Sequence, residues 1–123
     1  MSRLARTALA ALTVALGAWL SGAGHAAGTH VHAQSTVLVS MQNQQFLPAN
    51  ITVAAGTTVV WENDDDPSDP DHNSHDVAAD DGSFYNDTLI LPGQQFAVTL
   101  TTPGTYSYYC DLHVDMIGVV TVQ

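Results

Sequence analysis

The sequence predicts an all-β protein, an antiparallel Greek-key β-sandwich. Three observations support this fold class in the 123-residue chain. Short runs alternate apolar and polar residues, as strands with one buried face do. Turn-forming pairs separate these runs at short intervals, which is typical of sandwiches and barrels. No sustained helical period follows the N-terminal segment.

The expected strands follow from this alternation, and each ends near a turn signal. Val37, Val39 and Met41 alternate with Leu38 and Ser40, and Phe96 begins a similar run. The predicted strands cover residues 37–41, 50–54, 57–62, 75–79, 96–101, 106–110 and 117–122, with turns at 81–82, 92–93 and 103–104. The core is expected to include Trp61, Tyr106 and Tyr108. Tyr106, after Pro103-Gly104, is similar to the tyrosine corner of Greek-key sandwiches.

The N-terminal segment has the layout of a secretory signal peptide, which we assign to residues 1–27. Arg3 and Arg6 precede an apolar run of 13 residues over 8–20, and small residues follow. Cleavage after residue 23, 26 or 27 fits equally well. The run is too short to span a bilayer comfortably. The mature protein is therefore expected in a periplasm or outside the cell, without membrane insertion.

The mature chain is expected to have a flexible tail over 28–34 and one folded domain over 35–123. Both arginines lie in the leader, so the mature chain has no Lys or Arg. All 12 acidic residues lie between Glu62 and Asp115, which gives a formal charge near −12. This charge argues against nucleic acid and anionic membranes as partners. It favours a basic protein partner or a high-salt setting, and a self-repelling surface without a partner role is the alternative.

Three metal-binding side chains lie within seven residues near the end of the chain: Cys110, His113 and Met116. Cys110 is the single cysteine, so no internal disulfide can form. Cys110 ends one predicted strand and Met116 precedes the next, which makes the segment between them a tight loop. A thiolate, an imidazole and a thioether together select copper, whereas structural zinc takes four strong ligands.

A second histidine must come from elsewhere in the chain, and His75 is the best candidate. It opens the predicted strand over 75–79, and Val77 continues that strand. His72 lies three residues earlier and competes for the role, although we expect it to be exposed. Two histidines and a cysteine in a plane with a weak axial methionine form a blue-copper electron-transfer site.

The motifs around these ligands resemble the cupredoxin family, in particular its plastocyanin- and amicyanin-like branch. The resemblance covers residues 46–123, most of the mature domain. The spacing C-x-x-H-x-x-M is similar to the short ligand loop of amicyanins. The other similar motifs are Phe46-Leu47-Pro48, Ile51-Thr52-Val53, Gly56, Val60-Trp61, Asp80-Asp81-Gly82-Ser83-Phe84, Pro103-Gly104-Thr105-Tyr106 and Tyr108-Tyr109-Cys110.

The resemblance implies one mononuclear type 1 copper that alternates between Cu(I) and Cu(II). His75, Cys110 and His113 would be the strong equatorial ligands and Met116 the axial one. His113 would lie at the solvent edge, where electrons pass to and from a partner that docks around Leu112, Val114 and Pro48.

Two features depart from the family pattern. Asp76 follows the first histidine ligand, where plastocyanins usually have Asn. A side chain at this position tends to hydrogen-bond the loop that carries the thiolate. The loop over 63–74 is longer and more acidic than usual, and we expect it to be solvated.

The function expected from these features is a monomeric electron shuttle between a redox donor and acceptor, without catalysis of its own. The alternative is copper storage, delivery or tolerance in the cell envelope, which the other histidines and the acidic loop support. A small copper oxidase is a third possibility, but only one type of site is visible. If cleavage follows residue 27, Gly28-Thr29-His30 could form a second Cu(II) site; the competing reading is a disordered tail.

Overall fold

The computed structural model describes Gly28 and residues 33–123, and these residues form eight strands and no helix. The predicted all-β class is therefore confirmed. The strands are β1 (Thr36–Gln42), β2 (Gln45–Leu47), β3 (Asn50–Val53), β4 (Thr57–Asn63), β5 (Ala78–Ala79), β6 (Gln95–Leu100), β7 (Gly104–Tyr109) and β8 (Ile117–Val122).

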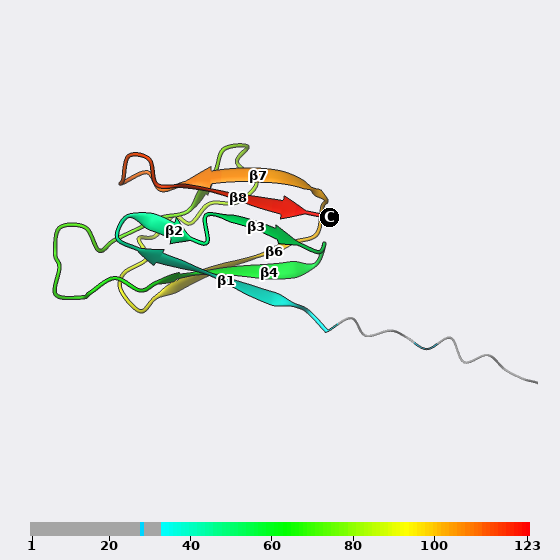
Figure 1. Ribbon diagram of the computed structural model, residues 1–123, viewed down its shortest axis with the longest axis horizontal. Coiled ribbons are helices and arrows are strands. Elements are labelled where there is room, and N and C mark those ends of the chain that lie inside the picture. The colour runs from blue at the N-terminus through cyan, green and yellow to red at the C-terminus, as the bar shows by residue number, and fades with distance from the viewer. Residues whose placement is uncertain (1–27, 29–32) are drawn as a thin grey trace, which may run out of the picture. The chain divides into compact units, whose positions relative to one another are not determined.

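The strands form two four-stranded sheets that face each other as a sandwich (Figure 1). One sheet has the order β2-β1-β4-β6 and the other has the order β3-β8-β7-β5. Each sheet is mixed rather than wholly antiparallel, because β1 pairs with β4 and β3 pairs with β8 in parallel. Period-two alternation is the same in parallel and antiparallel strands, so the sequence pattern could not reveal these two pairs.

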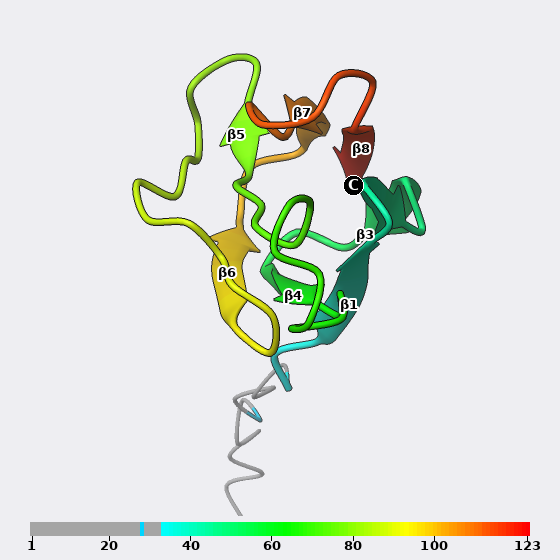
Figure 2. The same cartoon turned by 90° about the vertical axis from the view of Figure 1, so that its left-hand side faces the viewer.

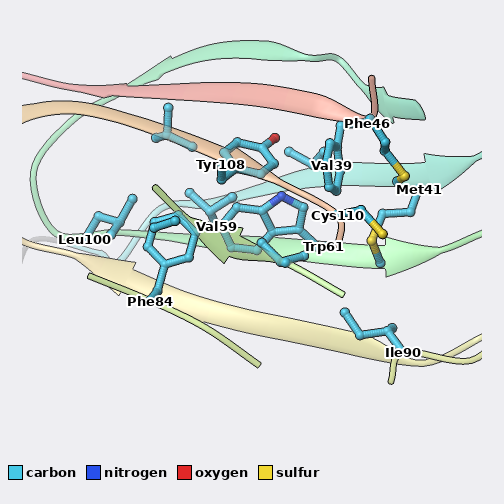
Figure 3. Close-up of a cluster of buried hydrophobic side chains, with 14 of the residues drawn as sticks. Val39, Met41, Phe46, Val59, Trp61, Phe84, Ile90, Leu100, Tyr108 and Cys110 are labelled. Carbon is cyan, nitrogen blue, oxygen red and sulfur yellow. The ribbon is translucent and has the colours of Figure 1, made fainter. Parts of the chain in front are cut away.

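Aromatic side chains pack against one another within the apolar core between the sheets (Figure 3). Trp61 projects from the centre of β4 and is fully buried. Its ring lies 5.3 Å from that of Tyr108 on β7, in an edge-on arrangement, and 5.4 Å from that of Phe84. Such aromatic pairs add stability beyond the area that they bury. These contacts join β4 of one sheet to β7 of the other near the loops that follow both strands.

The Tyr106 hydroxyl donates a hydrogen bond of 2.7 Å to the backbone oxygen of Thr102. This bond back to the preceding turn confirms the tyrosine corner expected from the sequence. It fixes the start of β7, the strand that leads to Cys110.

The two connections that contain the predicted ligands lie at the same end of the sandwich. One follows β4 and the other joins β7 to β8 (Figure 1). Figure 2 looks onto this end, with both connections facing the viewer. Residues 64–77 and 110–116 make up these connections. All four predicted metal ligands therefore lie in the loops at one end of the domain.

The predicted strand over 75–79 is shorter in the structure, where only Ala78 and Ala79 pair with β7. The preceding backbone finds partners in loop residues instead. His75 exchanges hydrogen bonds with Ile90, and the amide of Val77 donates to the Asn86 side chain at 2.5 Å. These bonds satisfy the backbone without a continuous ladder.

The predicted signal peptide and most of the predicted tail lie outside the described residues. The same holds for the amino-terminal Gly28-Thr29-His30 copper site, of which the structure describes Gly28 alone. Within the part that is described, no helix has the length and apolar character needed to cross a membrane.

Candidate metal centre

Three side chains from two distant segments converge at the loop end of the sandwich. His75, Cys110 and His113 each direct one donor atom into a common cluster, with all three atoms within 4.8 Å of one another. The two Nδ1 atoms lie 3.2 Å apart. The Cys110 Sγ lies 4.0 Å from Nδ1 of His75 and 3.6 Å from Nδ1 of His113. The structure thus brings the first histidine together with the short C-terminal motif.

The loop that carries the C-terminal ligands is closed by its own backbone. The amide of Cys110 donates to the carbonyl of Met116 at 3.0 Å, and the amide of Met116 donates to that of His113 at 3.3 Å. Asp115 turns the chain with φ of 66°, in the left-handed region. Met116 is buried, with 1% of its surface exposed. These bonds hold both ends of the predicted ligand loop together.

His75 is held more firmly than His113. Its side chain is fully buried, and its backbone pairs with Ile90 in both directions. Nδ1 faces the cluster, while Nε2 lies 2.5 Å from Oδ2 of Asp65. His113 is partly exposed, at the solvent edge of the cluster, as the resemblance implied.

Asp76 joins the two ligand segments, as expected from its position after His75. Its Oδ1 accepts a hydrogen bond of 2.7 Å from the amide of Asp111. Because Asp111 directly follows Cys110, this bond ties the thiol-bearing loop to the segment that carries His75. Such supporting bonds fix the orientation of metal ligands.

Burial and neighbouring charges set the protonation of the cluster. Burial raises the pKa of the Cys110 thiol, and backbone hydrogen bonds from Asp76 and Leu112 act in the opposite direction. Burial, followed by the charges of His75 and His72, lowers the pKa of His113. A lowered pKa favours the neutral imidazole, the form that binds metals.

The donor set suits a transition metal that binds soft and borderline ligands. A circle through the three donor atoms has a radius of about 2.1 Å, close to the roughly 2.0–2.3 Å of metal bonds to imidazole and thiolate. One thiolate and two imidazoles suit copper, with a thioether as weak fourth donor. A structural zinc site would require a fourth strong ligand.

His72 stays outside this cluster. Its side chain is exposed, and its ring centroid lies 6.4 Å from that of His113. The sequence-based preference for His75 over His72 therefore agrees with the arrangement of the donor atoms.

Sequence reasoning missed Asp65, which contacts the far side of the His75 ring. Asp65 stands in the middle of three consecutive aspartates, and no local pattern separates it from Asp64 or Asp66. Only its distance from His75 in the fold reveals its role.

Comparisons with known proteins agree with this geometry. A sequence model of the cupredoxin-like domain matches residues 9–122. A chloroplastic plastocyanin of Oryza sativa subsp. indica is 36% identical over 125 residues, which cover 93% of this chain and 74% of the plastocyanin.

Two solved structures are also similar. Amicyanin from Paracoccus versutus is 26% identical with a TM-score of 0.59, covering 76% of this chain and 86% of amicyanin. A copper-containing nitrite reductase from Thermus scotoductus is 28% identical with a TM-score of 0.63, and this chain covers 22% of that enzyme. The aligned part is 74% of this chain.

The small β-sandwich, with two histidines and a cysteine clustered in its end loops, places this chain in the class of type 1 copper electron-transfer proteins. Within this class, the chain belongs to the cupredoxin-like family.

Proposed function

We propose that this chain is an exported, monomeric carrier of single electrons, in which His75, Cys110, His113 and Met116 hold one copper ion. The observation that carries the proposal is the convergence of three donor atoms from two segments of the chain, because His75 lies 35 positions before Cys110 and 38 before His113. The signal-peptide pattern over 1–27 supports a location in a periplasm or outside the cell.

The bound copper would take up and release one electron by alternating between Cu(I) and Cu(II). The protein contributes a rigid frame around this exchange. His75 is fixed by its backbone pairing with Ile90, and Cys110 by the bonds at both ends of its loop. Little movement of the ligands on reduction or oxidation makes electron exchange fast. Four protein donors leave no open position for a substrate, so we assign no catalysis to the site.

The path for electrons leads through His113, the partly exposed ligand. Two exposed apolar side chains flank it in the chain: Leu112 with 49% and Val114 with 91% of their surface exposed. An apolar patch beside a ligand offers a surface for brief docking of a redox partner. Pro48 is also exposed, and we include it in the docking surface.

The acidic charge of the domain favours a basic redox partner. We expect the association rate of the copper-loaded protein with a basic electron acceptor to fall as salt concentration rises, because salt screens the steering charges. Stopped-flow mixing over a range of ionic strengths measures this rate. As a matched comparison, Val114→Ser should slow electron transfer at every salt concentration while keeping the salt dependence. A rate that rises with salt would exclude electrostatic attraction.

Copper titration of the purified mature protein tests the proposed function against copper handling. We expect one tightly bound Cu(II) per chain, an intense blue colour, and an EPR spectrum of a type 1 site. One-electron reduction should bleach the colour, and reoxidation should restore it. Several weakly held copper ions without blue colour would instead support storage or delivery, the alternative that His72 and the acidic loop suggest.

A further inference from the structure

We infer that Asp65 is a positioning residue that orients the His75 imidazole and biases the site toward Cu(II). The inference rests on the proposed role of His75 as a ligand. It starts from one contact: Oδ2 of Asp65 lies 2.5 Å from Nε2 of His75, on the side of the ring opposite the donor cluster. The His75 side chain is fully buried, and that of Asp65 is 9% exposed.

The carboxylate of Asp65 is itself held in place by the turn between β1 and β2. Its Oδ1 accepts a hydrogen bond of 2.8 Å from the amide of Asn43. Asn43 lies in the turn between β1 and β2 with φ of 52°, in the left-handed region. Both oxygens of Asp65 therefore have a partner.

The backbone around Asp65 is anchored as well. The amide of Asp65 donates to Oδ1 of Asn63 at 3.0 Å. Asn63 is 1% exposed, and its Nδ2 donates to the carbonyls of Asn73 and Ile90 at 2.7 Å each. The Asn63 side chain thus clamps the two ends of the acidic loop and joins them to Ile90, the backbone partner of His75.

This geometry decides which ring nitrogen of His75 faces the metal with a free lone pair. A carboxylate only accepts hydrogen bonds, so Nε2 carries the proton that is shared with Asp65. Nδ1 then presents its lone pair toward Sγ of Cys110 and Nδ1 of His113. The tautomer needed for metal binding is therefore set before a metal arrives.

The same contact acts on the redox equilibrium. A carboxylate that accepts a hydrogen bond from the far ring nitrogen makes an imidazole a stronger donor to a metal. A stronger donor and a nearby negative charge both stabilise Cu(II) more than Cu(I). Asp65 should therefore lower the reduction potential. The neighbouring acidic residue Asp66 is exposed, and its side chain accepts hydrogen bonds from the amide and the hydroxyl of Ser68. Asp66 therefore serves to separate the effect of the Asp65 contact from that of a negative charge elsewhere in the same loop.

Asp65→Asn tests the inference, with Asp66→Asn as the matched control for charge in the same loop. The amide has one oxygen for two donors, so either His75 or Asn43 then faces an NH₂ group. We expect Cu(II) affinity to fall about 10- to 100-fold in Asp65→Asn. Cu(I) affinity should change less. A tenfold loss of Cu(II) relative to Cu(I) binding corresponds to a rise in midpoint potential of about 59 mV for one electron.

Competition titrations with each copper state and voltammetry supply two independent readouts, and the control should show a much smaller change in both. An equal change in the two variants, or equal losses of Cu(I) and Cu(II) affinity, would overturn the role of Asp65. A wild-type protein without blue copper would instead overturn the proposed function.

A measurement on the wild-type protein covers the case in which Asp65→Asn does not fold. In the diamagnetic Cu(I) form, proton NMR should show the Nε2 proton of His75 as a slowly exchanging, downfield signal. Burial and the bond to a carboxylate both protect this proton from water. A rapidly exchanging proton, or protonation at Nδ1, would refute the inference.

Discussion

Cys110→Ser is expected to abolish the blue absorption completely and to weaken copper binding strongly. The colour of a type 1 site arises from charge transfer between thiolate sulfur and Cu(II), and Cys110 is the single cysteine of the chain. A serine hydroxyl is a hard, protonated donor that cannot replace the thiolate. Visible absorption and EPR after addition of one equivalent of Cu(II) measure the result. Retained blue colour would show that sulfur from Cys110 does not bind the metal.

The two histidines near the acidic loop provide the matched control for this experiment. His75→Ala should also remove the type 1 spectrum, because His75 is fully buried with Nδ1 in the donor cluster. His72→Ala should keep it, because the exposed His72 ring lies outside that cluster. The reverse outcome would assign the first ligand to His72.

Gly118→Ala is expected to destabilise the domain by about 1–3 kcal/mol or more, the usual cost of overpacking. A Cβ atom at Gly118 would lie 2.8 Å from Cε1 of Tyr108 and closer still to Cζ and the hydroxyl oxygen. Tyr108 is 1% exposed and packs edge-on against Trp61, so its ring has little room to move. In a domain of this size, each kcal/mol lowers Tm by about 4–8 °C, which thermal unfolding of the metal-free protein measures.

A double-mutant cycle separates this clash from a general effect of alanine in β8. Tyr108→Leu removes the atoms that the new methyl group would meet, so Gly118→Ala should cost much less in that background. The expected coupling is about 0.5–3 kcal/mol. Equal costs in both backgrounds would mean that the ring of Tyr108 is not the obstacle.

Most of the strands were predictable because they have one buried face, but β2 (Gln45–Leu47) was not among those expected. In β4, for example, burial alternates along the whole strand, and Val59 and Trp61 point into the core. Pairing was less predictable, because alternation does not distinguish parallel from antiparallel neighbours. The strand expected from His75 onward is shorter than predicted, since its first residues bond to Ile90 and Asn86 rather than to a neighbouring strand.

The donor cluster was predictable in large part because three of its expected ligands lie within seven residues. His75 required one further step, the choice between two histidines three residues apart. Asp65 was not predictable, because its role depends on the direction of the Asn43 amide and on the Asn63 clamp, which come from other parts of the chain. A run of three aspartates is typical of a solvated surface, and nothing in the local sequence distinguishes the one that turns inward.

The position of β8 has a consequence for the order of events during synthesis. β8 is the last strand along the sequence, yet it lies between β3 and β7 and pairs with both. A nascent chain that ends before Ile117 lacks the strand that joins these two, and β3 then has no partner in its sheet. Cys110, His113 and Met116 also emerge just before that strand. The two sheets can therefore be completed, with all four predicted ligands present, only after nearly all of the domain has left the ribosome.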